Sequence, residues 1–253
     1  MREFLDRVAG YLAAKVILGF LCWFYFRVVH RKEVEIIGKG NIPRGGRVLF
    51  YANHPSMMDP FLLSCLFFPR CIFQPKMLPW TPAAQENFFP DNCRKIPVLK
   101  EIPYVRDRRL FAWVMKHANA IPVRQGRQDP YVLKSMLIRI EIGGNVLIFP
   151  EGSRTKTGEL DEFKEGVALL AGRAKKIVPI WIEGAEVILS KGQDWPQWSG
   201  NKIVVKVGKP LKKGWWRSLV SSLLLSKEQR RADLIKRMRE ELLKLKSART
   251  RIY

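Results

Sequence analysis

The chain contains 253 residues, and 47% of them are hydrophobic, which excludes a chain too polar to bury a core. This length suits one large domain or a domain with an appendage. With 45 Lys and Arg against 23 Asp and Glu, the net charge of +22 favours anionic partners: nucleic acid, acidic lipid headgroups or an acidic carrier. The basic residues are spread along the chain, so charge alone does not choose among these partners.

The four cysteines form no CxxC pair and show no zinc-ligand spacing. We therefore expect free thiols in a reducing compartment rather than a disulfide framework. None of them lies in a sequence context that would activate a cysteine nucleophile. The four are Cys22, Cys65, Cys71 and Cys93.

Residues 8–29 form an apolar segment that Lys15 interrupts. A helix needs about 20 apolar residues to span a bilayer, and a lysine in its middle is unfavourable unless the segment lies flat or bends back. Residues 16–26 carry no charge but hold five aromatic residues, and basic residues follow them. This order is typical of an interfacial anchor. We therefore expect residues 1–29 to form a membrane-anchoring helical segment.

Two other interpretations of this segment stay open, a helix buried in the core and a single transmembrane span. A cleavable signal peptide fits poorly, because the charges follow the apolar part and no A-x-A cleavage site is present.

The rest of the chain, residues 30–253, is expected to form one α/β domain that ends in a basic helical region at 215–253. Short apolar runs predict strands, and amphipathic patterns between them predict helices. This alternation implies a mainly parallel central sheet flanked by helices. The predicted strands are 47–51, 145–149, 177–182 and 203–207, and the predicted helices are 60–68, 110–119, 131–142 and 163–174.

Residues 69–103 hold seven prolines, which forbid long helices or central strands and predict an irregular excursion. Its aromatic residues would form a membrane lip or a cover for the acyl chain if exposed, or would otherwise pack on one another. Residues 212–217 place two tryptophans among basic residues and resemble a second interfacial patch. Residues 226–246 predict a charged helix that docks on the core through apolar side chains at helical spacing.

The first chemical motif, residues 53–59, follows the first predicted strand. Residues five apart on a continuous helix do not face each other, so His54 and Asp59 can meet only if a helix begins between them. Pro55 disfavours a helical conformation at His54, and Pro60 is a natural first helical residue with Asp59 as its N-cap. A carboxylate that accepts from one imidazole nitrogen leaves the other as a base. The alternative is that Asp59 only caps the helix.

The second motif, residues 149–154, reads Phe-Pro-Glu-Gly-Ser-Arg and follows the second predicted strand. Glu151 and Arg154 lie in a Gly-Ser turn whose backbone amides can also donate hydrogen bonds. Arginine suits phosphate because its planar fork donates two parallel hydrogen bonds. A short extended stretch at 121–127 adds Arg124 as a further candidate. Taken singly, each arginine is more often a solvated surface charge than a ligand of phosphate.

Both motifs follow predicted strands, and sites on parallel sheets gather beyond the carboxyl ends of the strands. We therefore expect the two motifs to meet at one edge of the sheet.

These stretches resemble, in order, the four sequence blocks of the glycerolipid acyltransferase family that includes the 1-acylglycerol-3-phosphate acyltransferases. The resemblance covers residues 48–184, and residues 111–113 and 163–166 resemble two further family stretches. One block alone would be weak, but the ordered set is specific. The blocks are His54-x4-Asp59, Ile121-Pro122-Val123-Arg124, Phe149-Pro150-Glu151-Gly152-Ser153-Arg154 and Ile177-Val178-Pro179-Ile180.

The resemblance implies an enzyme of phospholipid biosynthesis that moves a fatty acyl group from acyl-CoA or acyl carrier protein to a lipid hydroxyl. It implies no metal and no other cofactor. His54 would be the general base, and Asp59 would orient it, with no acyl-enzyme intermediate. The acceptor-binding residues implied by the resemblance are Arg124, Glu151, Gly152, Ser153 and Arg154.

The partners implied are membrane lipids and the acyl donor, with no nucleic acid, at the cytoplasmic face of a membrane such as the bacterial inner membrane. Pro55 stands where lysophosphatidate enzymes often have Gln, so the acceptor stays open. Besides 1-acylglycerol-3-phosphate, the candidates are a lyso-ornithine lipid, another lysophospholipid and glycerol-3-phosphate. A catalytically silent lipid-binding relative is the alternative from another class. A nucleic-acid-binding protein is disfavoured because no zinc-finger, KH or RNA-recognition signature is present.

Overall fold

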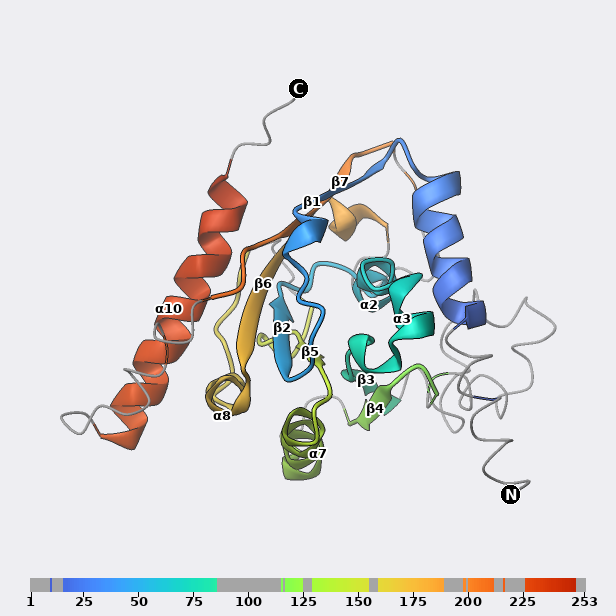
Figure 1. The fold of residues 1–253 in the computed structure, drawn as a ribbon. Coiled ribbons are helices and arrows are strands. Elements are labelled where there is room, and N and C mark those ends of the chain that lie inside the picture. The colour runs from blue at the N-terminus through green and yellow to red at the C-terminus, as the bar shows by residue number, and fades with distance from the viewer. Residues whose placement is uncertain are drawn as a thin grey trace, which may run out of the picture.

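A central sheet lies between two layers of helices (Figure 1). The expected α/β fold, with a mainly parallel sheet flanked by helices, is confirmed. The computed structural model describes residues 16–85, 117–124, 129–154, 159–188, 200–211 and 226–248, together with residues 10, 115, 198 and 216.

The central sheet has the strand order β1-β7-β6-β2-β5, and every neighbouring pair is parallel except β6 and β7. β2 is buried along its whole length, as expected for a strand covered on both faces. The sequence predicted four of these strands and missed β1, a short strand with a glutamate inside it. The strands are β1 (Val34–Ile37), β2 (Val48–Ala52), β5 (Val146–Ile148), β6 (Lys176–Glu183) and β7 (Ile203–Val207).

Alternate residues of β2 enter two separate cores, because successive strand side chains point to opposite faces. Phe50 packs in the core that contains the N-terminal helix and α2 (Asp59–Ser64). Leu49 and Tyr51 pack in the other core, against the helices of the opposite layer. Those helices are α7 (Pro130–Glu141), α8 (Gly166–Arg173) and α10 (Lys227–Ser247).

Helices α7 and α10 begin at good N-caps and bury one apolar stripe each. The Asp129 side chain caps α7, and Ser226 forms a capping box at the start of α10. The Tyr51 hydroxyl donates to the main-chain oxygen of Met238 at 3.0 Å, which ties α10 to β2. The predicted docking of the C-terminal helix is therefore confirmed. The buried stripes are Val132, Met136 and Ile140 in α7, and Leu234, Met238 and Leu242 in α10.

The described part of the proline-rich excursion, residues 69–85, is irregular as predicted. Its two short helices lead into a strand that pairs in parallel with β4, and this two-stranded sheet was not predicted. Residues 86–103 lie outside the described residues. The elements are α3 (Arg70–Phe73), η3 (Pro75–Met77), β3 (Thr81–Ala84) and β4 (Ala120–Val123).

The N-terminal helix covers one side of the molecule next to α2 and α3 (Figure 1). Residues 16–24 are α-helical and continue into the π-helix η1 (Tyr25–Val29). Cys22 and Phe26 face the core, whereas Leu21 and several other apolar side chains are exposed. Among the helices of the described residues, none combines the length and the apolar character needed to cross a membrane. Attachment of this segment to a membrane stays a prediction.

Two smaller predictions fall mostly outside the described residues. Of residues 212–217 the structure describes Trp216, which is buried against the core of α8 and α10. The expected interfacial position of that tryptophan is therefore wrong. Of the predicted helix 110–119, the structure describes residues 115 and 117, which are helical, and residues 118 and 119, which form a turn.

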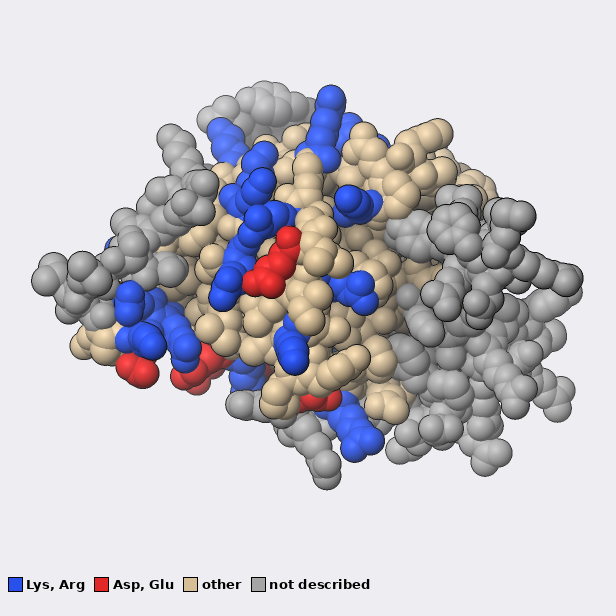
Figure 2. Space-filling view, turned by 60° about the horizontal axis from the view of Figure 1, so that its bottom comes forward, with Lys and Arg blue, Asp and Glu red and all other residues tan. Residues whose placement is uncertain are grey.

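Basic side chains gather on the face that Figure 2 brings forward, which is the lower end of the molecule in Figure 1. Two of the helices there, α7 and α8, carry Arg139 and Arg173 in their last turns, where cations interact favourably with the helix dipole.

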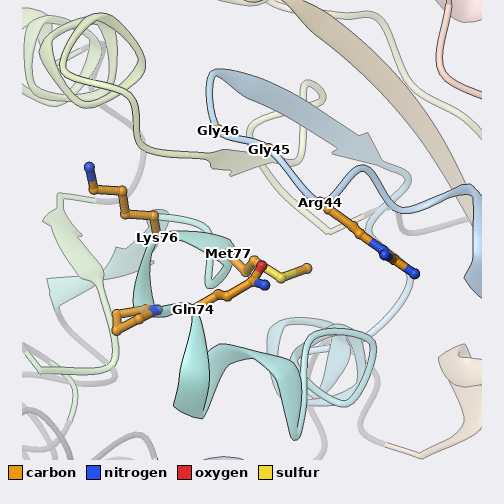
Figure 3. A pocket seen from close by; sticks show the side chains of 7 residues that line it. Arg44, Gly45, Gly46, Gln74, Lys76 and Met77 are labelled. Carbon is orange, nitrogen blue, oxygen red and sulfur yellow. The ribbon is translucent and has the colours of Figure 1, made fainter.

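A cavity of about 350 Å³ is lined by residues 44–46, which precede β2 in the sequence, and by residues 74–77. Its two cationic side chains, Arg44 and Lys76, extend in different directions (Figure 3).

Candidate active site

His54 lies in the loop after β2 and contacts Asp59, the first residue of α2. Nδ1 of His54 lies 2.7 Å from Oδ2 of Asp59, which also accepts the main-chain N–H of Ser56 at 2.8 Å. The helix begins at Asp59, so this residue is the first helical residue and not the N-cap that the sequence predicted. Met58 takes the N-cap position, and the Asp59 carboxylate is left to bind the imidazole.

Burial dominates the electrostatics of Asp59, which is 0% exposed. Loss of solvation raises the pKa of this carboxyl, whereas the His54 ring, the Ser56 N–H and the Arg154 charge lower it. An ionised carboxylate only accepts hydrogen bonds. Contact with ionised Asp59 therefore holds the imidazole hydrogen on Nδ1 and leaves the lone pair on Nε2, as a general base requires.

The loop after β5 supports His54 from a second direction. The His54 ring stacks on Phe149, with ring centroids 4.1 Å apart and planes inclined by 19°. The carboxylate of Glu151 accepts the main-chain N–H of His54 at 2.9 Å and that of Asp161 at 3.0 Å. Burial raises the pKa of Glu151, and these two N–H donors lower it. Both motifs therefore meet at the carboxyl edge of the sheet, as their positions after β2 and β5 predicted.

Arg154 follows the same turn and is half-buried. Loss of solvation lowers the pKa of its guanidinium, and the negative charge of Asp59 raises it. The two charges are thus close enough to influence each other. Gly152 adopts φ 76°, a left-handed conformation that favours glycine, and its N–H donates to the main-chain oxygen of Phe149 at 3.0 Å. This turn leaves Gly152 and Ser153 exposed beside the dyad.

Residues 33–183 of the chain match the family model described as Acyltransferase, and this range is more than half of the chain. The chain belongs to the acyltransferase family. The match contains both the His54–Asp59 dyad and the turn that carries Glu151 and Arg154.

Curated relatives of the chain bear the name 1-acyl-sn-glycerol-3-phosphate acyltransferase. The chloroplastic protein of Arabidopsis thaliana is 31% identical over 107 residues, which are 40% of this chain and 29% of that protein. The protein of Saccharomyces cerevisiae is 24% identical over 185 residues, which are 71% of this chain and 52% of that protein. The matches thus span about a third to a half of the relatives' own lengths.

The crystal structure of the 1-acyl-sn-glycerophosphate acyltransferase of Thermotoga maritima shares the fold. It superposes with a TM-score of 0.57 at 19% identity and covers 99% of this chain and 98% of that chain.

The remaining acceptor-site candidate, Arg124, follows β4 in the two-stranded sheet. Its side chain is exposed, and its place in the site stays a prediction. The structure therefore brings together His54, Asp59, Glu151 and Arg154, while Arg124 is contributed by a separate sheet.

Sequence reasoning gave no role to Asn53, which is 6% exposed between β2 and His54. Its Nδ2 donates to the main-chain oxygen of Ile182, and the Ile182 N–H donates to its Oδ1, both at 2.7 Å. The available clue was its position, a polar residue between a buried strand and the candidate base.

Within the part of the chain that the structure describes, no three His, Cys, Asp or Glu side chains come together as a metal ion would need.

Proposed function

We propose that this protein transfers a fatty acyl group from acyl-CoA or acyl carrier protein to the hydroxyl of a lysophospholipid, with 1-acylglycerol-3-phosphate as the leading acceptor. The product would be phosphatidic acid, in phospholipid biosynthesis. The observation that carries the proposal is the contact of 2.7 Å between His54 and buried Asp59, with Arg154 beside them. Family membership and the names of the relatives support the reaction class.

In the proposed reaction, Nε2 of His54 takes the proton of the acceptor hydroxyl as its oxygen attacks the thioester carbonyl. A C–O bond forms, the resulting tetrahedral intermediate collapses, and the C–S bond breaks. The proton on His54 then passes to the departing thiolate. Asp59 stabilises the imidazolium that exists between these steps. Holding alcohol and thioester in the reacting geometry can lower the barrier by about 7–11 kcal/mol.

Arg154 is the proposed ligand of the acceptor phosphate, with Arg124 as a second one. A half-buried guanidinium next to the base suits an anion carried by the same molecule as the hydroxyl. Gly152 and Ser153 are proposed to line the acceptor site, and their backbone amides are candidates for stabilising the oxyanion. Glu151 is proposed to shape this site through its hydrogen bonds to two main-chain N–H groups.

The N-terminal helix is proposed to attach the protein to the cytoplasmic face of a membrane. Among its described residues, the outward face exposes large apolar side chains at helical spacing, which suits burial in a bilayer interface. The excess of basic residues favours an anionic membrane. The exposed side chains are Ile17, Phe20, Leu21, Phe24 and Val28.

A cysteine nucleophile is disfavoured by the burial of the described cysteines. Cys22, Cys65 and Cys71 are buried, and burial raises the pKa of Cys22 to about 11 and that of Cys65 further. A thiol of this kind is protonated at neutral pH and is a poor nucleophile.

The experiment that tests the proposal is acyl transfer from radiolabelled palmitoyl-CoA and palmitoyl carrier protein into a panel of lysolipids and glycerol-3-phosphate. We expect labelled phosphatidic acid from 1-acylglycerol-3-phosphate. A product from another acceptor alone would keep the reaction and replace the substrate. No product from any acceptor, in detergent and in vesicles, would overturn the enzyme and favour the silent lipid-binding relative.

A further inference from the structure

The side chain of Asn53 continues the pairing of β2 with β6 beyond the end of the main-chain ladder. The paired residues of the two strands end with Ala52 and Ile180. One residue later, the Asn53 amide replaces a main-chain peptide group, because it both donates to and accepts from Ile182 at 2.7 Å. Two short, complementary hydrogen bonds inside the protein fix this residue to the sheet, and His54 is the next residue of the chain.

His54 is held from the opposite side by Glu151, which accepts its main-chain N–H at 2.9 Å. Asn53 binds β6 and Glu151 follows β5, so the two bonds connect this short segment to both strands that flank β2. The Phe149 ring and the Asp59 carboxylate then fix the imidazole itself. With the main chain anchored on both sides, the position of the ring is set by the sheet and not by the loop.

We propose that Asn53 is a positioning residue that fixes the reactive position of His54 through the main chain. This inference rests on the proposed role of His54 as the general base. In this role Asn53 acts through the peptide that it shares with His54, and not through a contact with substrate. A displacement of about 1 Å at a catalytic group can lower the rate about 100-fold, and this is the effect expected when the Asn53 bonds are lost.

The chain offers a matched control at the other end of the same strand. Asn145 is 1% exposed, its Oδ1 accepts the N–H of Val48 at 3.0 Å, and its Nδ2 donates to the main-chain oxygen of Met77 at 3.2 Å. It therefore makes the same kind of bonds as Asn53, but to the first residue of β2. Loss of either amide should reduce stability, whereas only loss of Asn53 should displace His54.

The experiment compares the full-length variants Asn53→Asp and Asn145→Asp with the wild-type protein across a range of pH. A protonated carboxyl both donates and accepts, as the amide does, and burial raises the pKa of the introduced group. The Asn53→Asp variant should therefore approach the wild-type kcat at low pH and fall about 100-fold below it at high pH, where the ionised carboxylate cannot donate to Ile182. The acceptor KM should not change.

In Asn145→Asp, the unfolding temperature should fall with rising pH in the same way, while kcat per folded molecule stays at the wild-type value. Equal changes of kcat in the two variants, or a loss in Asn53→Asp that appears in KM alone, would overturn the inference. A kcat ratio of Asn53→Asp to wild type that is independent of pH would also overturn it. The Asn53→Asp side chain is close in shape to that of the wild type, and its protonated form keeps both hydrogen bonds to Ile182. The variant can therefore be shown to fold at low pH before the pH is raised.

The His54→Ala variant separates this inference from the proposed function. If His54→Ala keeps its activity, the proposed general base is wrong. If His54→Ala is inactive while Asn53→Asp matches the wild-type kcat at every pH, only the positioning role is wrong.

Discussion

The carboxylate of Glu151 accepts the main-chain N–H of His54 at 2.9 Å, although the two residues are 97 positions apart in the sequence. Its second oxygen accepts the N–H of Asp161 at 3.0 Å, so both oxygens of this buried side chain bind the protein's own backbone. This arrangement indicates that Glu151 supports the main chain of the site.

Replacing Glu151 with Gln should lower kcat about tenfold and leave the acceptor KM nearly unchanged. A glutamine keeps one acceptor oxygen and places an NH2 group against the other N–H, which loses one buried hydrogen bond worth about 1–3 kcal/mol. Steady-state kinetics measure the two constants. Glu183→Gln is the control, because it removes an exposed glutamate at the end of β6. A large rise in the acceptor KM would instead assign Glu151 to direct contact with the substrate.

The free energy of unfolding should fall with rising pH in the region where Asp59 titrates. Burial raises the pKa of Asp59 in the folded protein, so the folded state binds the proton more tightly than the unfolded state. Stability from this group is fully present below the unfolded pKa and is lost as pH rises through the folded pKa. Denaturant unfolding of wild type and Asp59→Asn over this range measures the effect. The variant should lack this contribution, and identical pH dependence in the two proteins would contradict it.

Arg154→Ala should raise the KM for 1-acylglycerol-3-phosphate more than it lowers kcat. A hydrogen bond to a charged group contributes about 1.5–3 kcal/mol, which corresponds to a loss of roughly 10- to 100-fold in kcat/KM. An acceptor without phosphate should be affected far less. Arg173→Ala is the control, because Arg173 is an exposed arginine at the end of α8. An equal loss for acceptors with and without phosphate would show that Arg154 acts on the dyad instead.

Charge placed on the outward face of the N-terminal helix should weaken binding to anionic vesicles. Leu21 and Phe24 are both exposed, so a double variant with Leu21→Glu and Phe24→Glu should keep its fold. It should lose the burial of two large apolar side chains in the membrane, each worth about 1.5–3 kcal/mol. Vesicle sedimentation should show a loss of more than tenfold. Ile138→Glu changes an exposed apolar residue of α7 and should bind as the wild type does. Equal binding of all three proteins would contradict the anchor.

The sequence predicted four of the central strands and the meeting of the two motifs. It could do so because apolar runs, their length and the positions of prolines are local signals. The prediction that Pro55 and Pro60 bracket a new helix start is confirmed, but the helix begins at Asp59, one residue earlier than predicted. This shift of one residue determines whether Asp59 caps the helix or binds the imidazole, and it depends on the local backbone conformation.

The supporting bonds of the site could not be predicted, because they join segments far apart in the sequence. Asn53 forms hydrogen bonds with Ile182, which is 129 positions away in the sequence. The sequence around Asn53 looks like that of any strand followed by a polar residue. The pairing of β3 with β4 is hidden for a similar reason: each strand has four residues, and Thr81–Ala84 contains a proline.

The central claim is that His54, oriented by Asp59, is the base of an acyl transfer to a lysophospholipid. The most direct measurement is the initial rate of phosphatidic acid formation from palmitoyl-CoA or palmitoyl carrier protein and 1-acylglycerol-3-phosphate, in wild type and in His54→Ala at matched folded concentration. General acid–base catalysis contributes about 10²- to 10⁴-fold, so the rate of the His54→Ala variant should fall by at least about 100-fold. Its unfolding temperature should stay within a few degrees of the wild-type value. A folded His54→Ala protein that forms phosphatidic acid at the wild-type rate would contradict the account.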